Sequence, residues 1–141
     1  MRTVLITTML LLLSSCSCPS STAVSQHAMP TVNSFCERHI GVAQPVELSE
    51  LLNNGHRYEG KAVSVSGYYS HGFEHSALYQ DAGIDPYTAD FSQGIWVDGI
   101  SPFFDGREAH VLLTGIYTQK SNGHLAQWPS SLCVAHVRPA S

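Results

Sequence analysis

Two short segments of the chain carry the same alternating pattern, and this pattern constrains the fold more than any other feature. Apolar and polar residues alternate, and each segment includes a glycine and a tyrosine: Val63, Val65, Gly67 and Tyr69 in the first, Val111, Leu113, Gly115 and Tyr117 in the second. A period of two is typical of a β-strand with one buried face. A glycine inside a strand usually marks a bulge or bend, as at a barrel corner. Two such strands predict a closed, coiled sheet in which Tyr69 and Tyr117 are buried.

Three further apolar runs complete the predicted sheet. They lie at residues 77–79, 95–97 and 132–137, and each of the two alternating segments is preceded by an aromatic-x-Gly-basic turn, at 58–61 and 104–107. Five short strands with turn-rich connections predict an all-β fold, a small five-stranded antiparallel barrel of the OB-like class. An open β-sandwich or roll is the alternative.

One short helix is expected before the first of these strands. Residues 46–48 fit a short strand, whereas 49–52 fit a helical turn that begins at Ser49 and ends at the Asn-Asn-Gly of 53–55. The helix is the preferred interpretation. The folded unit is then residues 35–138, roughly 100 residues, which is enough for one compact domain with one core.

The segment from Tyr58 to Tyr79 also resembles a known group of proteins. An aromatic residue, Gly-Lys, alternating valines, Gly-Tyr, a glutamate and a Leu-Tyr pair form the pattern of small uncharacterised bacterial proteins with OB-like domains. The resemblance covers about residues 45–118. It implies the fold alone, because that group offers no established catalytic residues to carry over.

The N-terminus has the layout of an export signal. Met1-Arg2 gives a positive end, and the uncharged, mostly apolar run of residues 3–13 follows. A transmembrane helix needs about 20 apolar residues, so this run is too short to span a bilayer comfortably. Residues 13–16, Leu-Ser-Ser-Cys, resemble the lipobox of bacterial lipoproteins. We therefore predict a signal peptide at 1–15 and lipid attachment at Cys16.

The lipobox resemblance implies acyl chains on Cys16 that hold the chain at a membrane. Several chains anchor firmly where one binds reversibly. Ser17 follows the cysteine, and by resemblance to the sorting rule of enteric bacteria this implies the outer membrane, facing the periplasm. Residues 16–34 are rich in Ser, Thr and Pro and predict a flexible, lipid-anchored linker. An ordinary signal cut nearby, for example after Ala23, is the alternative.

Charge and cysteine content agree with export. Without the signal the chain has six Lys or Arg against eleven Asp or Glu, a formal charge of −5. This argues against a nucleic-acid partner, because such proteins concentrate positive charge. Cys36 and Cys133 bracket the domain and can pair in an oxidising compartment, although two separate buried thiols remain the alternative. The sequence does not predict the fate of Cys18.

Candidate binding residues gather between residues 68 and 79. Tyr68 alternates away from the buried valines, and with His71, Phe73 and Tyr79 it is the predicted contact surface for a ligand. His71, Glu74 and His75 are an alternative set of metal ligands, since two imidazoles and a carboxylate lie within five residues. The order of these residues does not follow HExxH, and exposed loop histidines are the simpler interpretation.

No catalytic motif is recognisable, so the chain is expected to be neither an enzyme nor a cofactor binder. There is no G-x-S-x-G elbow, and the pairs of carboxylates are spaced as chance would place them. The sequence favours a lipid-anchored binding or adaptor module of the cell envelope that contacts a protein or a glycan. The alternatives are a metal-binding envelope protein and an inhibitor or immunity-type protein against an envelope-degrading enzyme.

Overall fold

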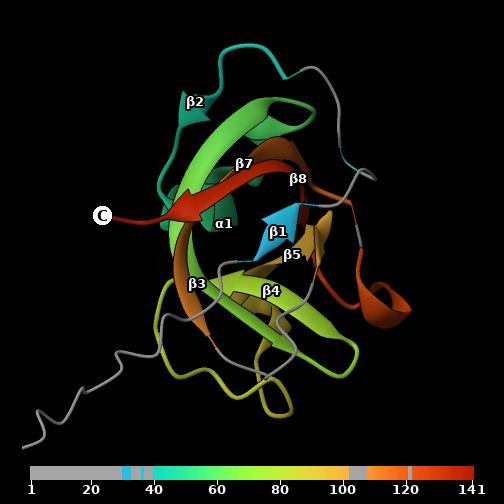
Figure 1. The fold of residues 1–141 in the computed structure, drawn as a ribbon. Helices are drawn as coiled ribbons and strands as arrows, with labels where there is room; N and C mark the ends of the chain where they lie inside the picture. The colour runs from blue at the N-terminus through green and yellow to red at the C-terminus, as the bar shows by residue number, and fades with distance from the viewer. Residues whose placement is uncertain (1–29, 33–35, 37–39, 102–107, 121) are drawn as a thin grey trace, which may run out of the picture.

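The structure is a computed structural model that describes residues 30–32, 36, 40–101, 108–120 and 122–141 (Figure 1). The predicted signal peptide, Cys16, Cys18 and the turn at 104–107 lie outside these residues. The described part is mostly β-strand, with one short α-helix. Its elements are β1 (Thr31–Val32), β2 (Gln44–Pro45), α1 (Leu48–Asn54), the 3₁₀-helix η2 (Gly55–Tyr58), β3 (Ala62–Gly72), β4 (His75–Tyr79), η3 (Phe91–Gln93), β5 (Gly94–Asp98), β6 (Ile100–Ser101), β7 (Ala109–Thr118), η4 (His124–Ala126) and β8 (Ser131–Pro139).

All five predicted strands are present, as β3, β4, β5, β7 and β8. Their pairings lead from β3 through β4, β5, β8 and β7 and back to β3, because β3 is long enough to pair with both β4 and β7 (Figure 1). The prediction that the sheet is antiparallel throughout is wrong at two places, and the sheet has a sixth strand, β2, beside the five predicted. β5 and β8 pair in parallel, which is possible because β6 and β7 separate them along the chain. The short β2 also pairs in parallel with β3.

The two strand glycines lie where the sheet changes direction. At Gly115 the register between β7 and β8 shifts, which is the predicted bulge, and a Cβ there would collide with the carbonyl of Cys133. Gly67 directly precedes the two residues of β3 that pair with both β7 and β4, and a Cβ there would lie 2.6 Å from the carbonyl oxygen of Tyr79. At both positions a neighbouring backbone approaches too closely for any side chain.

The main core lies inside this series of strands. Tyr69 and Tyr117 are buried in it, as predicted, beside the valines that alternate with the polar residues. α1 closes one end of the core with Leu48 and Leu51, and the hydroxyl of Tyr117 donates a hydrogen bond to the carbonyl oxygen of Leu51. No helix in the described residues is both long and apolar enough to cross a membrane.

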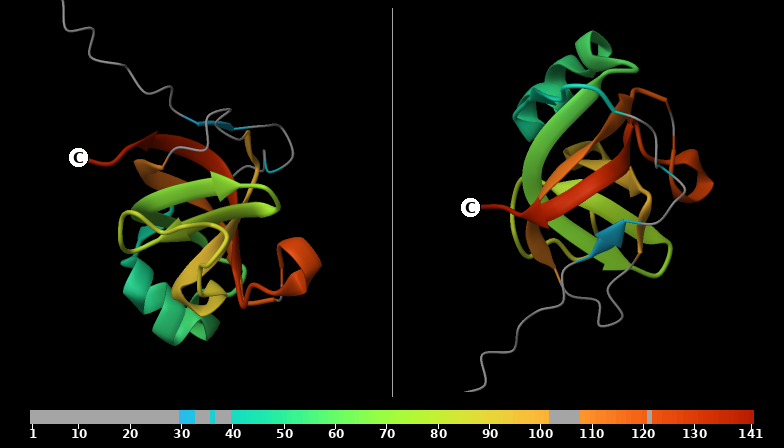
Figure 2. Two further views of the ribbon diagram at one scale, coloured as in Figure 1. Left: turned by 90° about the horizontal axis from the view of Figure 1, so that it is seen from below. Right: turned by 45° about the horizontal axis from the view of Figure 1, so that its top comes forward.

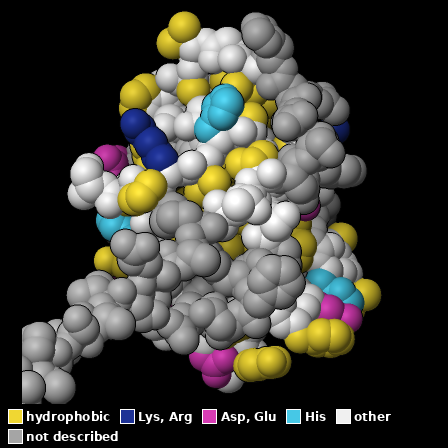
Figure 3. Space-filling view, in the orientation of Figure 1, with side chains coloured by type: hydrophobic (Ala, Val, Ile, Leu, Met, Phe, Trp, Pro, Cys, Tyr) yellow, Lys and Arg dark blue, Asp and Glu magenta, His cyan; other side chains and the backbone are white. Residues whose placement is uncertain are grey.

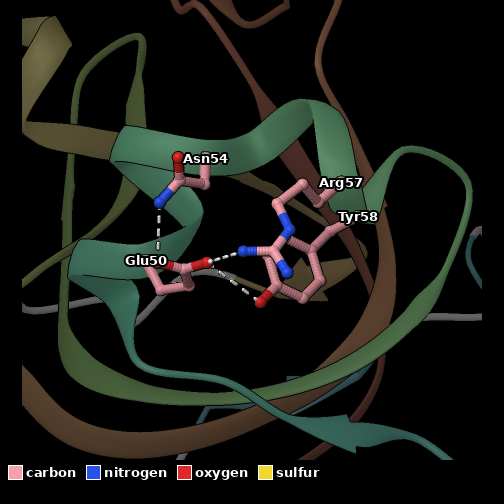
Figure 4. A network of polar contacts seen from close by, with 4 residues as sticks. All are labelled: Glu50, Asn54, Arg57 and Tyr58. Carbon is pink, nitrogen blue, oxygen red and sulfur yellow. Dashed lines mark hydrogen bonds and ion pairs between the residues drawn. The ribbon is translucent and has the colours of Figure 1, made fainter.

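The predicted short helix is present, but its start differs from the prediction. The N-cap is Glu47 rather than Ser49, and its side chain makes no capping hydrogen bond. Glu50, in the first turn of the helix, instead binds residues at and beyond its C-terminal end. Its carboxylate accepts hydrogen bonds from Asn54 at 2.8 Å, Arg57 at 3.2 Å and Tyr58 at 3.3 Å (Figure 4). One carboxylate therefore ties α1 to η2.

The two ends of the domain are joined near β8. Cys36 and Cys133 lie within disulfide-bonding distance, with their Cα atoms 5.4 Å apart, as the sequence predicted for this pair. β1 pairs with β6, so Thr31 and Val32 belong to the folded part although they lie in the predicted linker 16–34.

Candidate functional site

A second apolar cluster covers the outward face of β4 and β5. Ser76 and Leu78 point into the fold, so by alternation His75, Ala77 and Tyr79 point outward. Trp96 of β5 lies opposite Ala77 on the same face. Trp128, from the segment before β8, packs onto these side chains and is 1% exposed. The loop between β4 and β5 adds three partly buried residues, Ile84, Ala89 and Phe91. The cluster is a small satellite core built from distant segments.

His75 packs against two aromatic rings of this satellite core, those of Tyr79 and Trp128. Its ring lies 5.8 Å from that of Tyr79 and 5.3 Å from that of Trp128, and its Nε2 is 3.5 Å from the hydroxyl of Tyr79. Burial, with a smaller contribution from the nearby His71, lowers the pKa of His75 to about 4, while Asp85 acts in the opposite direction. Burial likewise raises the pKa of Tyr79, helped by Asp90. His75 is therefore neutral at physiological pH.

The turn between β3 and β4 projects beyond this cluster. Gly72 pairs with His75, which leaves Phe73 and Glu74 as the two residues at the tip of the hairpin. The side chain of Phe73 is 76% exposed. Glu74 has φ +56°, a left-handed conformation that a residue with a Cβ adopts only at an energetic cost.

The hairpin tip is joined to η4, the turn between β7 and β8. Oε2 of Glu74 lies 3.0 Å from Nε2 of His124. The next residue, Leu125, is 75% exposed. Figures 1 and 2 show the hairpin tip and η4 side by side, on the side of the molecule away from α1. Figure 3 shows, at its lower right, an acidic and a histidine side chain flanked by hydrophobic ones. We refer to Phe73, Glu74, His124 and Leu125 as the tip site.

Backbone strain is concentrated at this tip site. Among the residues that the structure describes, three non-glycine residues have a positive φ: Glu74, Leu125 and Ala126. All three belong to the hairpin tip or to η4. Bulky side chains such as leucine rarely adopt this conformation, and strained residues of this kind cluster at functional sites. The strain is thus a reason, independent of exposure, to regard the tip site as functional.

The structure separates the four residues predicted to contact a ligand. Phe73 is at the tip site, and Tyr68 lies on a different part of the surface, stacked on His110 with ring centroids 4.6 Å apart. His71 is partly buried, and burial lowers its pKa. Tyr79 is only 2% exposed, because Trp128 and the loop between β4 and β5 cover it. Of these four, Phe73 is the most accessible.

The alternative set of metal ligands is not brought together either. Glu74 points to His124, and His75 is 3% exposed between aromatic rings. Throughout the described ranges, no three His, Cys, Asp or Glu side chains lie close enough to one another to hold a metal ion.

Sequence reasoning missed the half of the tip site that comes from η4. His124 and Leu125 lie fifty residues beyond the hairpin, in a segment with no strand or helix pattern. Their one local signal is Gly123, whose φ of +76° lets the chain pass closely over the rings of Trp96 and Trp128.

No protein-family model, curated protein or solved structure has significant similarity to the chain.

Proposed function

We propose that the protein is a lipid-anchored binding or adaptor module of the cell envelope, and that the tip site is its contact surface. The folded part is proposed to be an OB-like barrel. This is supported by the order of pairing, in which the five strands follow one another back to β3 and one pair is parallel.

The envelope assignment rests on the N-terminal residues. The positive end, the short apolar run and the Leu-Ser-Ser-Cys of residues 13–16 support an acyl anchor on Cys16, with residues 16–34 leading to the domain. We place the protein at the outer membrane, facing the periplasm. The proximity of Cys36 and Cys133 supports an oxidising compartment of this kind.

The observation that carries the binding function is the coincidence of exposure and strain at one place. The side chains of Phe73 and Leu125 are 76% and 75% exposed. They flank the contact between Glu74 and His124, which joins two separate turns. Positive-φ residues hold both turns in conformations that a relaxed chain avoids. A rigid surface of this kind binds without a large ordering cost.

The partner is proposed to be a protein rather than a glycan. An aliphatic leucine and a phenylalanine offer apolar contact area, which suits the buried centre of a protein interface. The tip site has one carboxylate and one imidazole, already paired with each other, whereas a glycan needs several free hydrogen-bonding groups.

The test compares the double variant Phe73→Ala/Leu125→Ala with the control Val42→Ala. Val42 is also fully exposed, at 101%, but belongs to the segment before β2. Cells producing the full chain are treated with a cross-linker, and cross-linked species are identified by mass spectrometry. We expect one protein partner to be lost in the double variant and kept in the control. The proposal fails if both variants keep every partner, or if enriched glycans replace proteins.

The anchor is tested separately, on the wild-type protein. Mass spectrometry of the mature N-terminus is expected to find an acylated Cys16. An unmodified N-terminus elsewhere would remove the envelope anchor from the proposal.

The backbone strain also favours a second candidate, an inhibitor or immunity-type protein that inserts the tip site into an envelope-degrading enzyme. Rigid, strained loops are well suited to fill an enzyme cleft, because little entropy is lost on binding. Addition of the full chain to lysozyme or to a peptidoglycan amidase is the direct test. Inhibition that disappears in Phe73→Ala/Leu125→Ala supports this function, and full enzyme activity at saturating protein excludes it for these enzymes.

A further inference from the structure

A hollow of about 350 Å³ lies beside α1, at the opposite end of β4 from the tip site. One wall comes from α1, through Ser49, Leu52 and Asn53. The rest comes from the end of β4 and the loop that follows it. The lining from that side is Tyr79, Gln80, Asp81, Ile84, Ser92 and Gln93.

Several polar groups in this hollow have no partner among the described residues. The side chains of Asn53, Gln80 and Asp81 make no hydrogen bond or ion pair with any other residue of the described ranges, and all three are exposed. Two carboxamides and one carboxylate supply both donors and acceptors. Vicinal hydroxyl groups, each a donor and an acceptor, match such groups.

The floor of the hollow is apolar. Leu52 and Ile84 are partly buried, and Tyr79 belongs to the satellite core against which Ile84 packs. Six of the nine lining residues are Ser, Asn, Gln or Asp, so the hollow suits a ligand that carries many hydrogen-bonding groups. The C–H face of a sugar ring suits this floor.

A second hollow, of about 370 Å³, adjoins the first and shares Tyr79, Ile84 and Gln93 with it. The loop that walls it also carries Tyr87, whose side chain is 78% exposed. The carboxylate of Asp85 accepts a hydrogen bond from the backbone N–H of Tyr87 at 3.0 Å and so fixes the turn there. Tyr87 lines neither hollow itself, but its neighbours Asp85 and Thr88 line the second one, and an exposed ring on such a loop can stack on a sugar ring.

The charges of the two hollows argue against an anionic ligand. Asp81, Asp85 and Asp90 contribute to the lining, and no Lys, Arg or His of the described residues does. An anionic ligand would be repelled. Asp85 and Asp90 already accept hydrogen bonds from their own turns, and the described side chains form no metal-binding group.

The walls are held in place by contacts away from the hollow. The network of Glu50 fixes α1 (Figure 4), and the backbone N–H of Gly83 donates a hydrogen bond of 2.6 Å to Glu108 at the start of β7. These contacts hold the backbone of both walls.

From these observations we infer that the two adjoining hollows form a binding site for an uncharged oligosaccharide. The inference goes beyond the proposed function, because the site shares no residue with the tip site.

The experiment uses the full chain in dodecylphosphocholine micelles, since a detergent without a sugar headgroup cannot occupy the site. Tri-N-acetylchitotriose and maltotriose are the uncharged probes, and trigalacturonate is the charged one. Binding is followed by saturation-transfer NMR. We expect at least one uncharged probe to bind with a Kd on the order of 0.1–1 mM, and trigalacturonate to bind at least roughly tenfold more weakly.

Variants locate the binding. Gln80→Ala and Tyr87→Ala are each expected to weaken it by roughly fivefold to tenfold. Gln44→Ala, an exposed glutamine on β2, is the matched control for Gln80 and is expected to change nothing. Phe73→Ala/Leu125→Ala is also expected to bind the probe normally, so a failure of the tip site cannot be mistaken for a failure here.

Three results would overturn the inference. They are no transfer signal from either uncharged probe at about 10 mM, equal binding of the charged probe, and binding that Gln80→Ala and Tyr87→Ala leave unchanged.

Discussion

The carboxylate of Glu74 lies 3.0 Å from Nε2 of His124, and this pair joins two turns that are fifty residues apart in the chain. Both side chains are substantially exposed, at 45% and 36%. A contact this exposed contributes little to stability, because water and salt screen it. It brings the turns that carry Phe73 and Leu125 next to each other.

The strain at Glu74 predicts an unusual ranking of two substitutions. Glu74→Gly and Glu74→Ala both remove the carboxylate, but only glycine relaxes the φ of +56°. We expect the glycine variant to be more stable than the alanine variant by about 0.5–1 kcal/mol, measured by urea unfolding. Gln127, with φ −81°, is the matched control, and there alanine should be the more stable variant. Equal stability of the two Glu74 variants would argue against the strained turn.

Burial of His75 predicts a fall in stability in acid. The pKa of the folded state is about 4 against an ordinary value of 6.5, so between these values the unfolded chain binds a proton that the folded chain does not. The free energy of unfolding should therefore decrease as the pH falls from 6.5 to 4, by about 3 kcal/mol from this residue. His71 and Asp85 face His75 and modify the value.

The variant His75→Phe tests this origin of the acid sensitivity. It should lose much of the difference in urea stability between pH 8 and about pH 4.5, because phenylalanine keeps the ring packing without a proton-binding group. His136→Phe, at an exposed position on β8, should keep the wild-type difference. An unchanged pH dependence in His75→Phe would show that other groups cause it.

Two glycines with the same backbone angle predict different costs for an added methyl group. Gly83 has φ +77° and no atom within 4 Å of the position that a Cβ would take, whereas Gly123 has φ +76° and its Cβ would meet the rings of Trp96 and Trp128. Gly83→Ala should cost about 1 kcal/mol through backbone strain alone. Gly123→Ala should cost about 1–3 kcal/mol more and change the tryptophan fluorescence. Equal costs would contradict the close packing over the two rings.

The pairing of Cys36 with Cys133 predicts a redox-dependent stability. The two residues are 97 apart in sequence, so a bond between them restricts the unfolded chain strongly. Cys36→Ala/Cys133→Ala should lower the free energy of unfolding by about 2–5 kcal/mol. A reducing agent should destabilise the wild type and leave the double variant unchanged. A wild type that resists reductant without loss of stability would contradict the bond.

Local patterns in the sequence were sufficient to predict the strands. Alternation placed β3 and β7, buried Tyr69 and Tyr117, and marked the bulge at Gly115, because each of these depends on residues close together in the chain. The parallel pairing of β5 with β8 was not predicted, since it depends on how a long connection passes across the fold.

The candidate sites were harder to predict for the same reason. Tyr79 points away from the main core, as alternation indicates, but Trp128 and a loop cover it from outside. A period of two reports which face a side chain is on, not whether a distant segment lies over that face. The contact of Glu74 with His124 creates the tip site. The residues around Glu74 and those around His124 give no sign of this contact in the sequence.

The double pairing of β3 has a consequence for how the protein reaches its native state. The hairpin with β4 needs only neighbouring residues, but the pairing with β7 joins Val63 to Gly115 and must wait for loop closure across the whole middle of the chain. Topologies rich in such distant contacts fold in milliseconds to seconds rather than microseconds. A chain that emerges from its N-terminus would thus carry an incomplete sheet, with one flank of β3 open to other strands, until residue 118 is available.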